Sequence, residues 1–556
     1  MKNIASTIHI IRIRGLIVFF ILFASSYCQL NAQISQGGLP LSFNTSLKSS
    51  NIIPVEIMPA LDVDALLEED EFIDSQDGYP FRFSSNFKVN LSTENSGRWY
   101  EVDKGRIWQV RLKSVGAHSM HLIFSQYNLP PGATVYIYNA EKTHILGAFT
   151  DENNKAWGGL GVAPVVGDEI FVEYYEPKDA SFSGMLSIGE IGHGYRDIFG
   201  INDNRFGLSE KCNKDIICSV ADDWQIEKHA VCRIIYTNLS GNSYLCTGSL
   251  INNTNSDGIP YFLTANHCIP TINEAQTAIF YFNYESPSCN GPDGDISQTI
   301  SGSELRATTN KLDFSLLEMS QSVPLDYEPY FAGWDATPDP PENSTGIHHP
   351  LGDVKKISFY NFPATTDDFI YEFDFDDSTH WYIENWSSGI TQGGSSGSPL
   401  FNQNHHIVGD LTGGSIIANC TSADAYYAKF SDSWDKYSSN KEQLKYWLDP
   451  DTTNIQSLDG YSPTGLKIRN IRSVDKVFDI YPNPTSGYFT IQAKEDGLEI
   501  EQVELYDVLG KKVLERILAA SKGSITIKTN SLSEGLYLVR VYTKKEILTS
   551  KVRIKH

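Results

Sequence analysis

The chain has 556 residues, of which 41% are hydrophobic and 20% charged, so its composition is that of a folded globular protein rather than a disordered one. As a soft prior, this length suggests roughly three or four domains. The formal net charge of −24 argues against nucleic acid as a partner, because binding phosphates requires clustered Lys and Arg side chains. Charge of this sign fits a soluble protein and carries no information about the fold.

Residues 1–32 have the pattern of an export signal. A basic start, with Lys2 and Arg14, precedes the apolar run Leu16–Ala24, which is too short to span a bilayer as a mature helix. We expect cleavage after Ala32, and no later segment is long and apolar enough to be transmembrane. The sequence therefore predicts an exported protein, either secreted or at the cell surface.

A β-rich domain is expected over about 98–197. Turn signals such as Pro130-Pro131-Gly132 separate short segments rich in β-branched and aromatic residues, a pattern typical of a β-sandwich; these segments are Ile107–Leu112, Met120–Phe124, Thr134–Tyr138 and Glu169–Tyr174. We find no catalytic pattern in this stretch. Before it, the acidic run Asp62–Asp74 could form a short helix or a solvated tail, and the tail is the preferred interpretation.

Residues 207–461 contain every cysteine that remains once the signal is removed: Cys212, Cys218, Cys232, Cys246, Cys268, Cys289 and Cys420. In an exported protein, clustered cysteines predict disulfides rather than metal ligands. Their number is odd, so at least one is unpaired, and spacing alone cannot choose the partners. The length of this region suits a pair of β-barrels. Near its end, Ser438–Asp449 has the apolar spacing of a helix that Pro450 would stop.

A glycine-rich stretch, Gly393–Leu400, contains the pattern G-x-S-G-S-P with Ser396 at its centre. Glycine on both sides of a serine allows a tight turn, so that the hydroxyl and nearby backbone N–H groups can point into one cleft. In that arrangement Ser396 would be a nucleophile, and the N–H groups of Gly394 and Ser396 would form an oxyanion hole. Taken alone, the pattern is more typical of an ordinary loop.

A serine nucleophile needs a histidine base and usually a carboxylate that orients the histidine. The segment Thr264–Cys268 supplies His267 next to a cysteine. The segment Lys311–Leu317 places Asp313 directly before an apolar strand, where the alternative role is that of a strand-capping Asp. The chain order His, Asp, Ser is that of chymotrypsin and not that of subtilisin or the α/β-hydrolases.

The region 207–461 resembles the lysyl endopeptidases, a branch of the trypsin-like serine proteases. The motifs that carry the resemblance cover nearly all of the region: Cys212–Cys218, the CTGSL and TANHC segments, Asp313–Glu318, Ile347–Pro350, the Gly-Ser-Ser-Gly-Ser-Pro loop and Trp447–Pro450. The resemblance implies a chymotrypsin-like double β-barrel with the triad His267, Asp313 and Ser396. It also implies the disulfides Cys212–Cys420, Cys218–Cys289 and Cys246–Cys268, and it leaves Cys232 as a buried free thiol.

Substrate choice is a separate question. Trypsin has an Asp six residues before its nucleophile, and that position is Ile390 here. The lysyl endopeptidase pattern instead places the specificity acid after the last cysteine, which corresponds to Asp424. The substrate backbone would lie along Thr412, Gly413 and Gly414. Lysyl endopeptidases have a His at the position of Thr412, so strict discrimination of Lys over Arg is left open. No cofactor is expected, and His348 and His349 have no evident companion ligands for a metal.

The two flanking regions resemble known accessory segments. The pattern that ends in His193-Gly194-Tyr195-Arg196 loosely resembles the pro-region of lysyl endopeptidase precursors, which implies a pro-region over 33–206. Residues 477–556 resemble the C-terminal sorting domain of type IX secretion substrates, through Tyr481-Pro482-Asn483-Pro484, Leu505-Tyr506-Asp507 and Gly535-Leu536-Tyr537. This implies a small β-sandwich, export across an outer membrane and the type IX secretion machinery as a partner. Residues 462–476 look like a linker.

The sequence thus predicts a mainly β chain, in which a double β-barrel protease is flanked by an N-terminal sandwich-like pro-region and a C-terminal sorting domain. We expect a monomeric, secreted serine endopeptidase that cleaves protein or peptide substrates after Lys through an acyl-enzyme. Two alternatives stay open: a trypsin-like protease of other or mixed basic specificity, and a non-catalytic surface binding protein.

Overall fold

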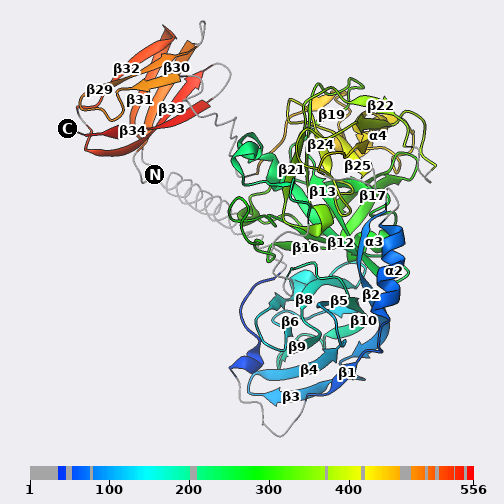
Figure 1. Ribbon diagram of the computed structural model, residues 1–556. Coiled ribbons are helices and arrows are strands. Elements are labelled where there is room, and N and C mark those ends of the chain that lie inside the picture. The colour runs from blue at the N-terminus through cyan, green and yellow to red at the C-terminus, as the bar shows by residue number, and fades with distance from the viewer. Residues whose placement is uncertain are drawn as a thin grey trace, which may run out of the picture.

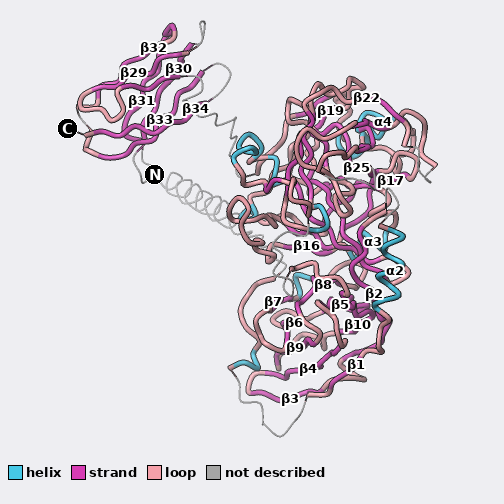
Figure 2. The backbone as a smooth tube through the Cα atoms, viewed as in Figure 1, coloured by secondary structure: helices cyan, strands magenta, loops and turns pink. Residues whose placement is uncertain are grey.

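The structure is a computed structural model that describes residues 35–44, 53–74, 79–200, 209–369, 374–414, 420–463, 478–494, 499–506, 512–530, 532–543 and 547–555 (Figure 1). Strands dominate these residues, and helices are few and short (Figure 2). None of the helices in these ranges has the length and apolar character needed to cross a membrane. The expected signal peptide 1–32, the expected boundary between residues 206 and 207, and most of the expected linker lie outside the described residues.

The N-terminal region forms two packed sheets, as expected for a β-sandwich. One has the order β1-β4-β9-β6-β7 with β3 beside β4, and its strands are β1 (Val55–Ile57), β3 (Arg98–Val102), β4 (Gly105–Lys113), β6 (Thr134–Asn139), β7 (Ile145–Phe149) and β9 (Glu169–Pro177). The other contains β2 (Phe81–Ser92), β5 (Ser119–Asn128), β8 (Leu160–Val166) and β10 (Met185–Gly194). Apolar side chains from both sheets share one core, among them Val110, Leu112, Leu122, Phe124 and Ile188.

The sequence interpretation was wrong at the start of this region in two ways. The domain begins well before residue 98, because β1 and β2 belong to its sheets. The acidic run is a helix, α2 (Val63–Ile73), and not a solvated tail. The side chain of Asp62 caps the helix by accepting from the N–H of Ala65 at 3.1 Å. The acidic residue Asp70 is fully buried against Arg82, 2.7 Å away, so the charge is paired instead of solvated.

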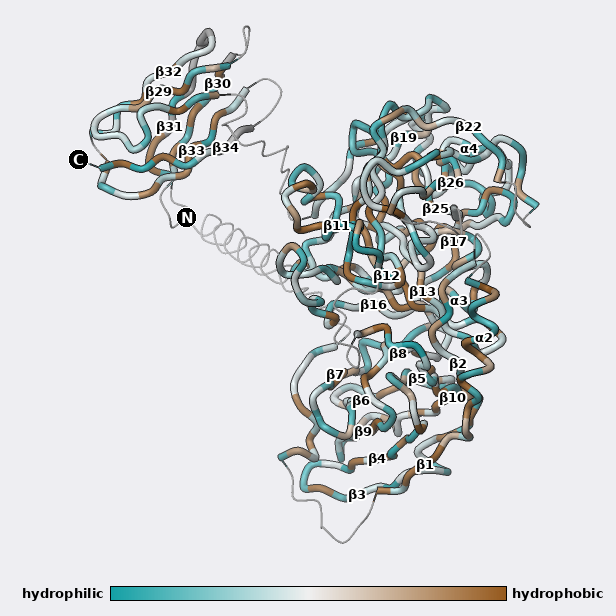
Figure 3. Tube along the Cα trace, viewed as in Figure 1, coloured by the Kyte–Doolittle hydropathy of each residue, from teal (hydrophilic) through white to brown (hydrophobic). Residues whose placement is uncertain are grey.

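The first barrel of the middle region continues directly from the N-terminal sandwich. Its sheet runs β16-β15-β12-β13 and then passes through β2 to β10, β5 and β8. The strands are β12 (Val231–Thr237), β13 (Asn242–Leu250), β14 (Tyr261–Ala265), β15 (Ile279–Tyr281), β16 (Thr299–Ser301), β17 (Ser303–Thr309) and β18 (Phe314–Met319), with α3 (Ile272–Thr277) between β14 and β15. Hydrophobic stretches gather on β12 and β13 in the middle of this sheet (Figure 3).

The second barrel has the order β11-β21-β20-β24-β25-β26-β23-β22, with β19 beside β25 and β27. Its strands are β11 (Lys214–Asp215), β19 (Trp334–Asp335), β20 (Ser344–His348), β21 (Lys356–Tyr360), β22 (Thr365–Asp367), β23 (His380–Ile383), β24 (Pro399–Phe401), β25 (Ile407–Gly413), β26 (Ala425–Lys429) and β27 (Ser457–Leu458). The chain is thus mainly β, and its middle region is a chymotrypsin-like pair of barrels.

The helix expected at Ser438–Asp449 is much shorter than predicted. Only α5 (Lys445–Leu448) is helical there, and a separate helix, α4 (Phe430–Asp435), precedes it. The N–H of Leu444 donates to the carbonyl of Ser433 at 2.9 Å, a bond to α4 that a continuous helix would not allow. The apolar residues of Ser438–Asp449 are therefore spaced for packing against the barrel and not for one continuous helix, because Leu444 and Leu448 are fully buried.

The structure joins six cysteines of the middle region in the pairs Cys212–Cys420, Cys218–Cys289 and Cys246–Cys268, with Cα–Cα separations of 5.5, 4.7 and 6.3 Å. These separations are ordinary for disulfides. Cys232 is free and buried on β12, and burial raises the pKa of its thiol. Such a thiol behaves as a small apolar side chain in the barrel core.

The C-terminal region has its own core. A three-stranded sheet contains β28 (Phe478–Tyr481), β29 (Tyr488–Ala493) and β32 (Ser524–Lys528), and a four-stranded sheet contains β30 (Glu499–Tyr506), β31 (Lys512–Lys522), β33 (Gly535–Thr543) and β34 (Ile547–Ile554). Alternate residues of both sheets face inward and are buried together, among them Phe489, Ile491, Val503, Val539 and Val541. This alternation is the strand pattern that the sequence predicted.

Candidate active site

His267 and Asp313 are brought together by the pairing of β14 with β18. The register places Ala265 opposite Phe314, so the residues just after β14 lie beside the residue just before β18. The Nδ1 atom of His267 lies 2.9 Å from Oδ2 of Asp313, and the backbone N–H of His267 donates to Oδ1 at 3.0 Å. Asp313 is 1% exposed, so both bonds are shielded from water. The carboxylate therefore fixes the orientation of the imidazole.

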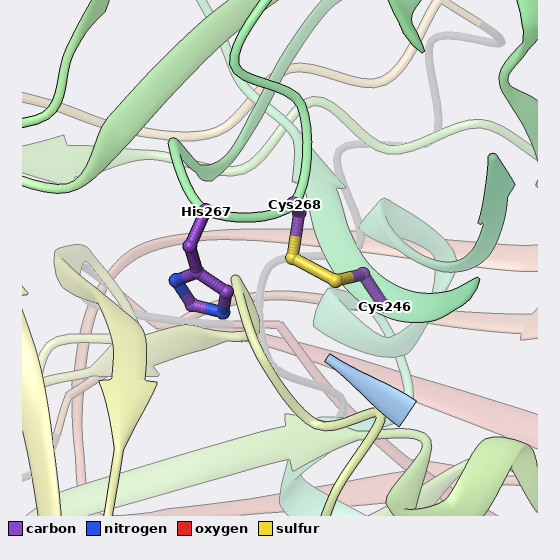
Figure 4. Close-up of side chains that lie close together, drawn as sticks. All are labelled: Cys246, His267 and Cys268. Carbon is purple, nitrogen blue, oxygen red and sulfur yellow. A yellow bond between two sulfur atoms is a disulfide. The ribbon is translucent and has the colours of Figure 1, made fainter. Parts of the chain in front are cut away.

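The disulfide Cys246–Cys268 lies beside His267 and ties the histidine loop to β13 (Figure 4). It links β13 to the residue after His267, and the three side chains lie within 4.8 Å of one another. Three such groups could suggest a metal site, but the two sulfurs are bonded to each other and offer no thiolate ligands. We therefore interpret this cluster as a brace for the histidine.

The loop around Ser396 docks onto β13 and β14. The N–H of Thr247, on β13, donates to the carbonyl of Ser396 at 2.8 Å, and its Oγ1 donates to the carbonyl of Gly394 at 2.8 Å. Gly397 has φ +77° and packs so closely that a Cβ there would lie 2.1 Å from Oγ1 of Thr264. Only glycine fits this position, and the close approach places Ser396 beside the histidine loop.

Several polar groups of this site have no partner among the described residues. The Nε2 atom of His267 is buried and accepts or donates no hydrogen bond there. The N–H groups of Gly394 and Ser396 donate to no carbonyl in those residues. When a carboxylate holds one nitrogen of an imidazole ring, the other nitrogen can accept a proton from a nucleophile. Backbone N–H groups without another partner can stabilise an oxyanion. The arrangement is therefore suited to acyl transfer.

His348 supports the loop that contains Ser396 through both of its ring nitrogens. Its Nδ1 lies 2.8 Å from Oγ of Ser395, and its Nε2 lies 3.0 Å from Oγ of Ser358. Burial lowers the pKa of His348 to about 3, so the ring is neutral and bridges two hydroxyls. The neighbouring His349 is also buried and pairs with the carbonyl of Asp353 at 2.9 Å. The sequence showed the two histidines but not this scaffolding role.

Asp424 lies directly before β26, next to the other residues predicted to contact substrate. An added Cβ on Gly414 would lie 2.4 Å from the carbonyl oxygen of Asp424, so the two backbones are in close contact. Burial and the neighbouring Asp424 carboxylate raise the pKa of the Tyr382 hydroxyl. Ile390 is 2% exposed and shares a core cluster with Ala423. The structure thus gathers these predicted residues at one end of the second barrel.

Sequence reasoning missed two buried groups near the histidine–aspartate pair. The Nε2 atom of His380 lies 3.2 Å from Oγ1 of Thr412, so a histidine from β23 contacts the position that is His in lysyl endopeptidases. Asp410, on β25, is 1% exposed, and its Oδ2 has no partner among the described residues. Burial, and then the charge of Asp313, raise the pKa of Asp410 well above its usual range. A buried, isolated Asp gives no signal in a sequence.

Three buried histidines predict a loss of stability in mild acid. Burial lowers the pKa of His121 and of His380 to about 4 and that of His348 to about 3. An unfolded histidine gains its proton near pH 6.5, so below that pH the unfolded state binds protons that the folded state does not. Each group then lowers the free energy of unfolding by about 1.4 kcal/mol per pH unit, or about 4 kcal/mol for the three.

Denaturant unfolding at several pH values between 7 and 4 measures this dependence. His121→Asn is the informative variant, because His121 contacts Oγ of Ser243 at 3.0 Å, away from the nucleophile loop. Its slope below about pH 6 should be shallower by about 1.4 kcal/mol per pH unit. An unchanged slope would mean that the folded protein also protonates this histidine.

Comparison with known proteins covers both the middle and the C-terminal regions. Residues 206–431 match the family described as lysyl endopeptidase, C-terminal domain, and residues 479–555 match the secretion system C-terminal sorting domain. A lysyl endopeptidase of Pseudomonas aeruginosa is 28% identical over 420 residues, which covers 71% of this chain and 80% of that protein. The sorting domain directs export across the outer membrane by type IX secretion.

Two solved protease structures match part of this chain at low sequence identity and low TM-score. A thermostable serine protease from an extremophilic microorganism is 13% identical, with a TM-score of 0.27, and covers 37% of this chain and 92% of that one. The protease Anisep from Arthrobacter nicotinovorans is 20% identical, with a TM-score of 0.26, and covers 36% and 90% of the two chains. The family match and the related enzyme identify the chain as a secreted serine endopeptidase that is similar to the lysyl endopeptidases.

Proposed function

We propose that this endopeptidase hydrolyses peptide bonds on the carboxyl side of Lys, with Ser396 as nucleophile, His267 as base and Asp313 as the residue that orients the base. The observation that carries the proposal is the buried His267–Asp313 pair, at 2.9 Å, beside a docked serine loop. The Nε2 atom of His267 has no competing partner among the described residues and is therefore open to the Ser396 hydroxyl.

In the proposed reaction, Oγ of Ser396 attacks the substrate carbonyl carbon and its proton passes to Nε2 of His267. The oxyanion accepts hydrogen bonds from the N–H groups of Gly394 and Ser396. The C–N bond then breaks, and the leaving amine takes the proton from His267. Water attacks the acyl-enzyme by the same route, which releases the acid and restores the serine.

The proposed specificity acid is Asp424, with the substrate backbone along Thr412, Gly413 and Gly414. An ammonium group entering beside a half-buried carboxylate would form a charge-assisted bond. The contact of His380 with Thr412, at 3.2 Å, supports a role for this histidine in shaping the same subsite. We propose that the enzyme prefers a basic residue before the cleaved bond and, more specifically, that it prefers Lys to Arg there.

The processing of the chain is part of the same proposal. Residues 1–32 would be removed as a signal peptide, 33–206 would act as a pro-region, and 462–476 would link the protease to the sorting domain. We expect the mature enzyme to act as a monomer on protein or peptide substrates. N-terminal and C-terminal sequencing of the secreted protein by mass spectrometry tests each boundary.

Digestion of a denatured protein of known sequence, followed by mass spectrometry of the products, tests the function. Cuts after Lys are expected, and pre-treatment with a serine-directed fluorophosphonate should abolish them. Cuts after Lys and Arg at equal rates would favour a trypsin-like enzyme of mixed basic specificity. A protein that cuts nothing and does not react with the fluorophosphonate would instead be a binding protein on a protease fold.

Replacing Asp313 with asparagine is expected to lower kcat by about 10⁴-fold, by analogy with other serine proteases. Asparagine preserves the volume of the buried side chain, but its NH2 group would favour the wrong imidazole tautomer. The measurement is steady-state hydrolysis of a lysyl peptide near neutral pH, with the thermal transition as a check on folding. A folded variant with full activity would remove Asp313 from the mechanism.

A further inference from the structure

One edge of β13 is shared by the N-terminal region and the nucleophile loop. On its first edge, β13 pairs with β12 from Ser243 to Ser249. On its second edge it pairs with β2 from Asn242 to Leu245, and then the N–H of Thr247 donates to the carbonyl of Ser396. The first residue of β2, Phe81, therefore lies directly beside the loop that contains Ser396.

The direction of β2 brings its start toward the catalytic centre. The two strands are antiparallel, with Phe81 opposite Leu245, so the chain before Phe81 leads toward Cys246 and Thr247. Pro80 precedes Phe81 and has no N–H, so it cannot donate to the edge and the ladder stops there. The pairing therefore covers the edge up to the last residue before the disulfide that braces His267.

The side chain of Phe81 also lies close to the loop that contains Ser396. A Cβ added to Gly393 would lie 3.6 Å from Cβ and Cδ2 of Phe81. The loop residue Leu351 donates its N–H to the carbonyl of Gly393 at 2.6 Å, and the Arg196 guanidinium lies 4.5 Å from the Phe81 ring centre. Phe81 thus lies next to both β13 and the loop that contains Ser396.

The start of β2 is anchored to the N-terminal region and not only to the barrel. Arg82 is 4% exposed and pairs with the fully buried Asp70 of α2 at 2.7 Å. Asp70 also accepts from the hydroxyl of Tyr195 at 2.7 Å and pairs with Arg196 at 3.0 Å. This buried network fixes the first residues of β2 in the extended form in which they pair with β13.

A peptide substrate needs this same edge. The residues that follow the cleaved bond must run away from the nucleophile in an extended form, and an extended segment is held most simply by pairing with a free strand edge. Of the described strands, β13 offers that edge next to Ser396, and β2 already fills it. We propose that β2 is an intramolecular inhibitor, which occupies the leaving-group side of the cleft through Phe81 and Pro80 as long as the N-terminal region is attached.

This inference rests on the proposed role of Ser396 as nucleophile, and its test compares two substrates on the intact chain. Both have the same acyl segment ending in Lys. One carries an aminocoumarin as leaving group, and the other continues for three residues after the cleaved bond. The variants are Phe81→Ala and, as a control, Phe87→Ala, because Phe87 is a similarly half-buried aromatic of β2 that pairs with Ile191 and not with β13. Mass spectrometry confirms that each chain is intact.

In intact wild type, the extended substrate should be cleaved no faster than the short one. Phe81→Ala should raise kcat/KM for the extended substrate by about tenfold and leave the short substrate unchanged, whereas Phe87→Ala should behave as wild type. A wild type that prefers the extended substrate, or a Phe81→Ala variant with an unaltered ratio, would overturn the inference. The wild-type comparison decides the question even if Phe81→Ala does not fold.

Labelling with a fluorophosphonate separates this inference from the proposed function. The reagent needs Ser396 and His267 but no residues on the leaving-group side. Failure to label any sample would overturn the role of Ser396. Normal labelling together with an unaltered substrate ratio would overturn only the role of β2.

Discussion

Replacing Ser396 with alanine is expected to lower kcat by about 10⁶-fold, by analogy with other serine proteases in which the nucleophile has been removed. The loss is large because no neighbouring group can form the acyl intermediate, and the oxyanion donors alone cannot replace it. The backbone bonds of the loop, from Thr247 to Ser396 and from Gly397 to Leu411, do not involve the hydroxyl and should persist. The variant should therefore fold normally.

Ser395→Ala is the matched control for this prediction. Ser395 is fully buried one position earlier, and its hydroxyl contacts His348 at 2.8 Å and accepts from the N–H of Gln392 at 3.2 Å. Its loss should loosen the loop and reduce activity by far less, while reaction with a fluorophosphonate is retained. If Ser395→Ala abolished labelling and Ser396→Ala did not, the nucleophile would have been assigned to the wrong serine.

The parts of the site that could be predicted are those in which chemistry and local sequence coincide. The histidine and aspartate lie at strand ends with apolar runs on one side, and the pairing of Ala265 with Phe314 brings them together. Gly397, next to Ser396, is required by a close approach that leaves no room for a Cβ. In each case a few adjacent residues carry both the chemistry and the backbone conformation.

The rest could not be predicted, because it depends on contacts between distant segments. His380 on β23 reaches Thr412 on β25 across the intervening strand β26, and Asp410 is buried near Asp313 with no sequence pattern to mark it. The helix α2 looked like a solvated acidic run because its buried partner, Arg82, belongs to the following strand. The pairing of β2 with β13 joins the expected pro-region 33–206 to the expected protease region 207–461, whose boundary was implied by the resemblance to lysyl endopeptidase precursors.

Replacing Asp424 with alanine is expected to lower kcat/KM for lysyl substrates by roughly 10²- to 10⁴-fold, the equivalent of about 3–5 kcal/mol for removing one partner of a buried ion pair. Two observations support this size. Asp424 is half-buried and its charge acts on Tyr382, so the carboxylate is not fully solvated. Ile390 occupies the position of trypsin's specificity acid and is buried among apolar side chains, so it cannot replace the lost charge.

The design compares Lys, Arg and uncharged substrates on wild type, Asp424→Ala and Glu384→Ala. Glu384 is an exposed acid that also acts on Tyr382, so it controls for the loss of negative charge near the same tyrosine. Only Asp424→Ala should lose the preference for Lys, and it should cleave the uncharged substrate about as fast as wild type does, because the triad is untouched. An equal loss of kcat/KM on all three substrates would mean that Asp424 stabilises the start of β26 and does not select the substrate. A wild type indifferent to the charge of the residue before the cut would show that this carboxylate selects nothing.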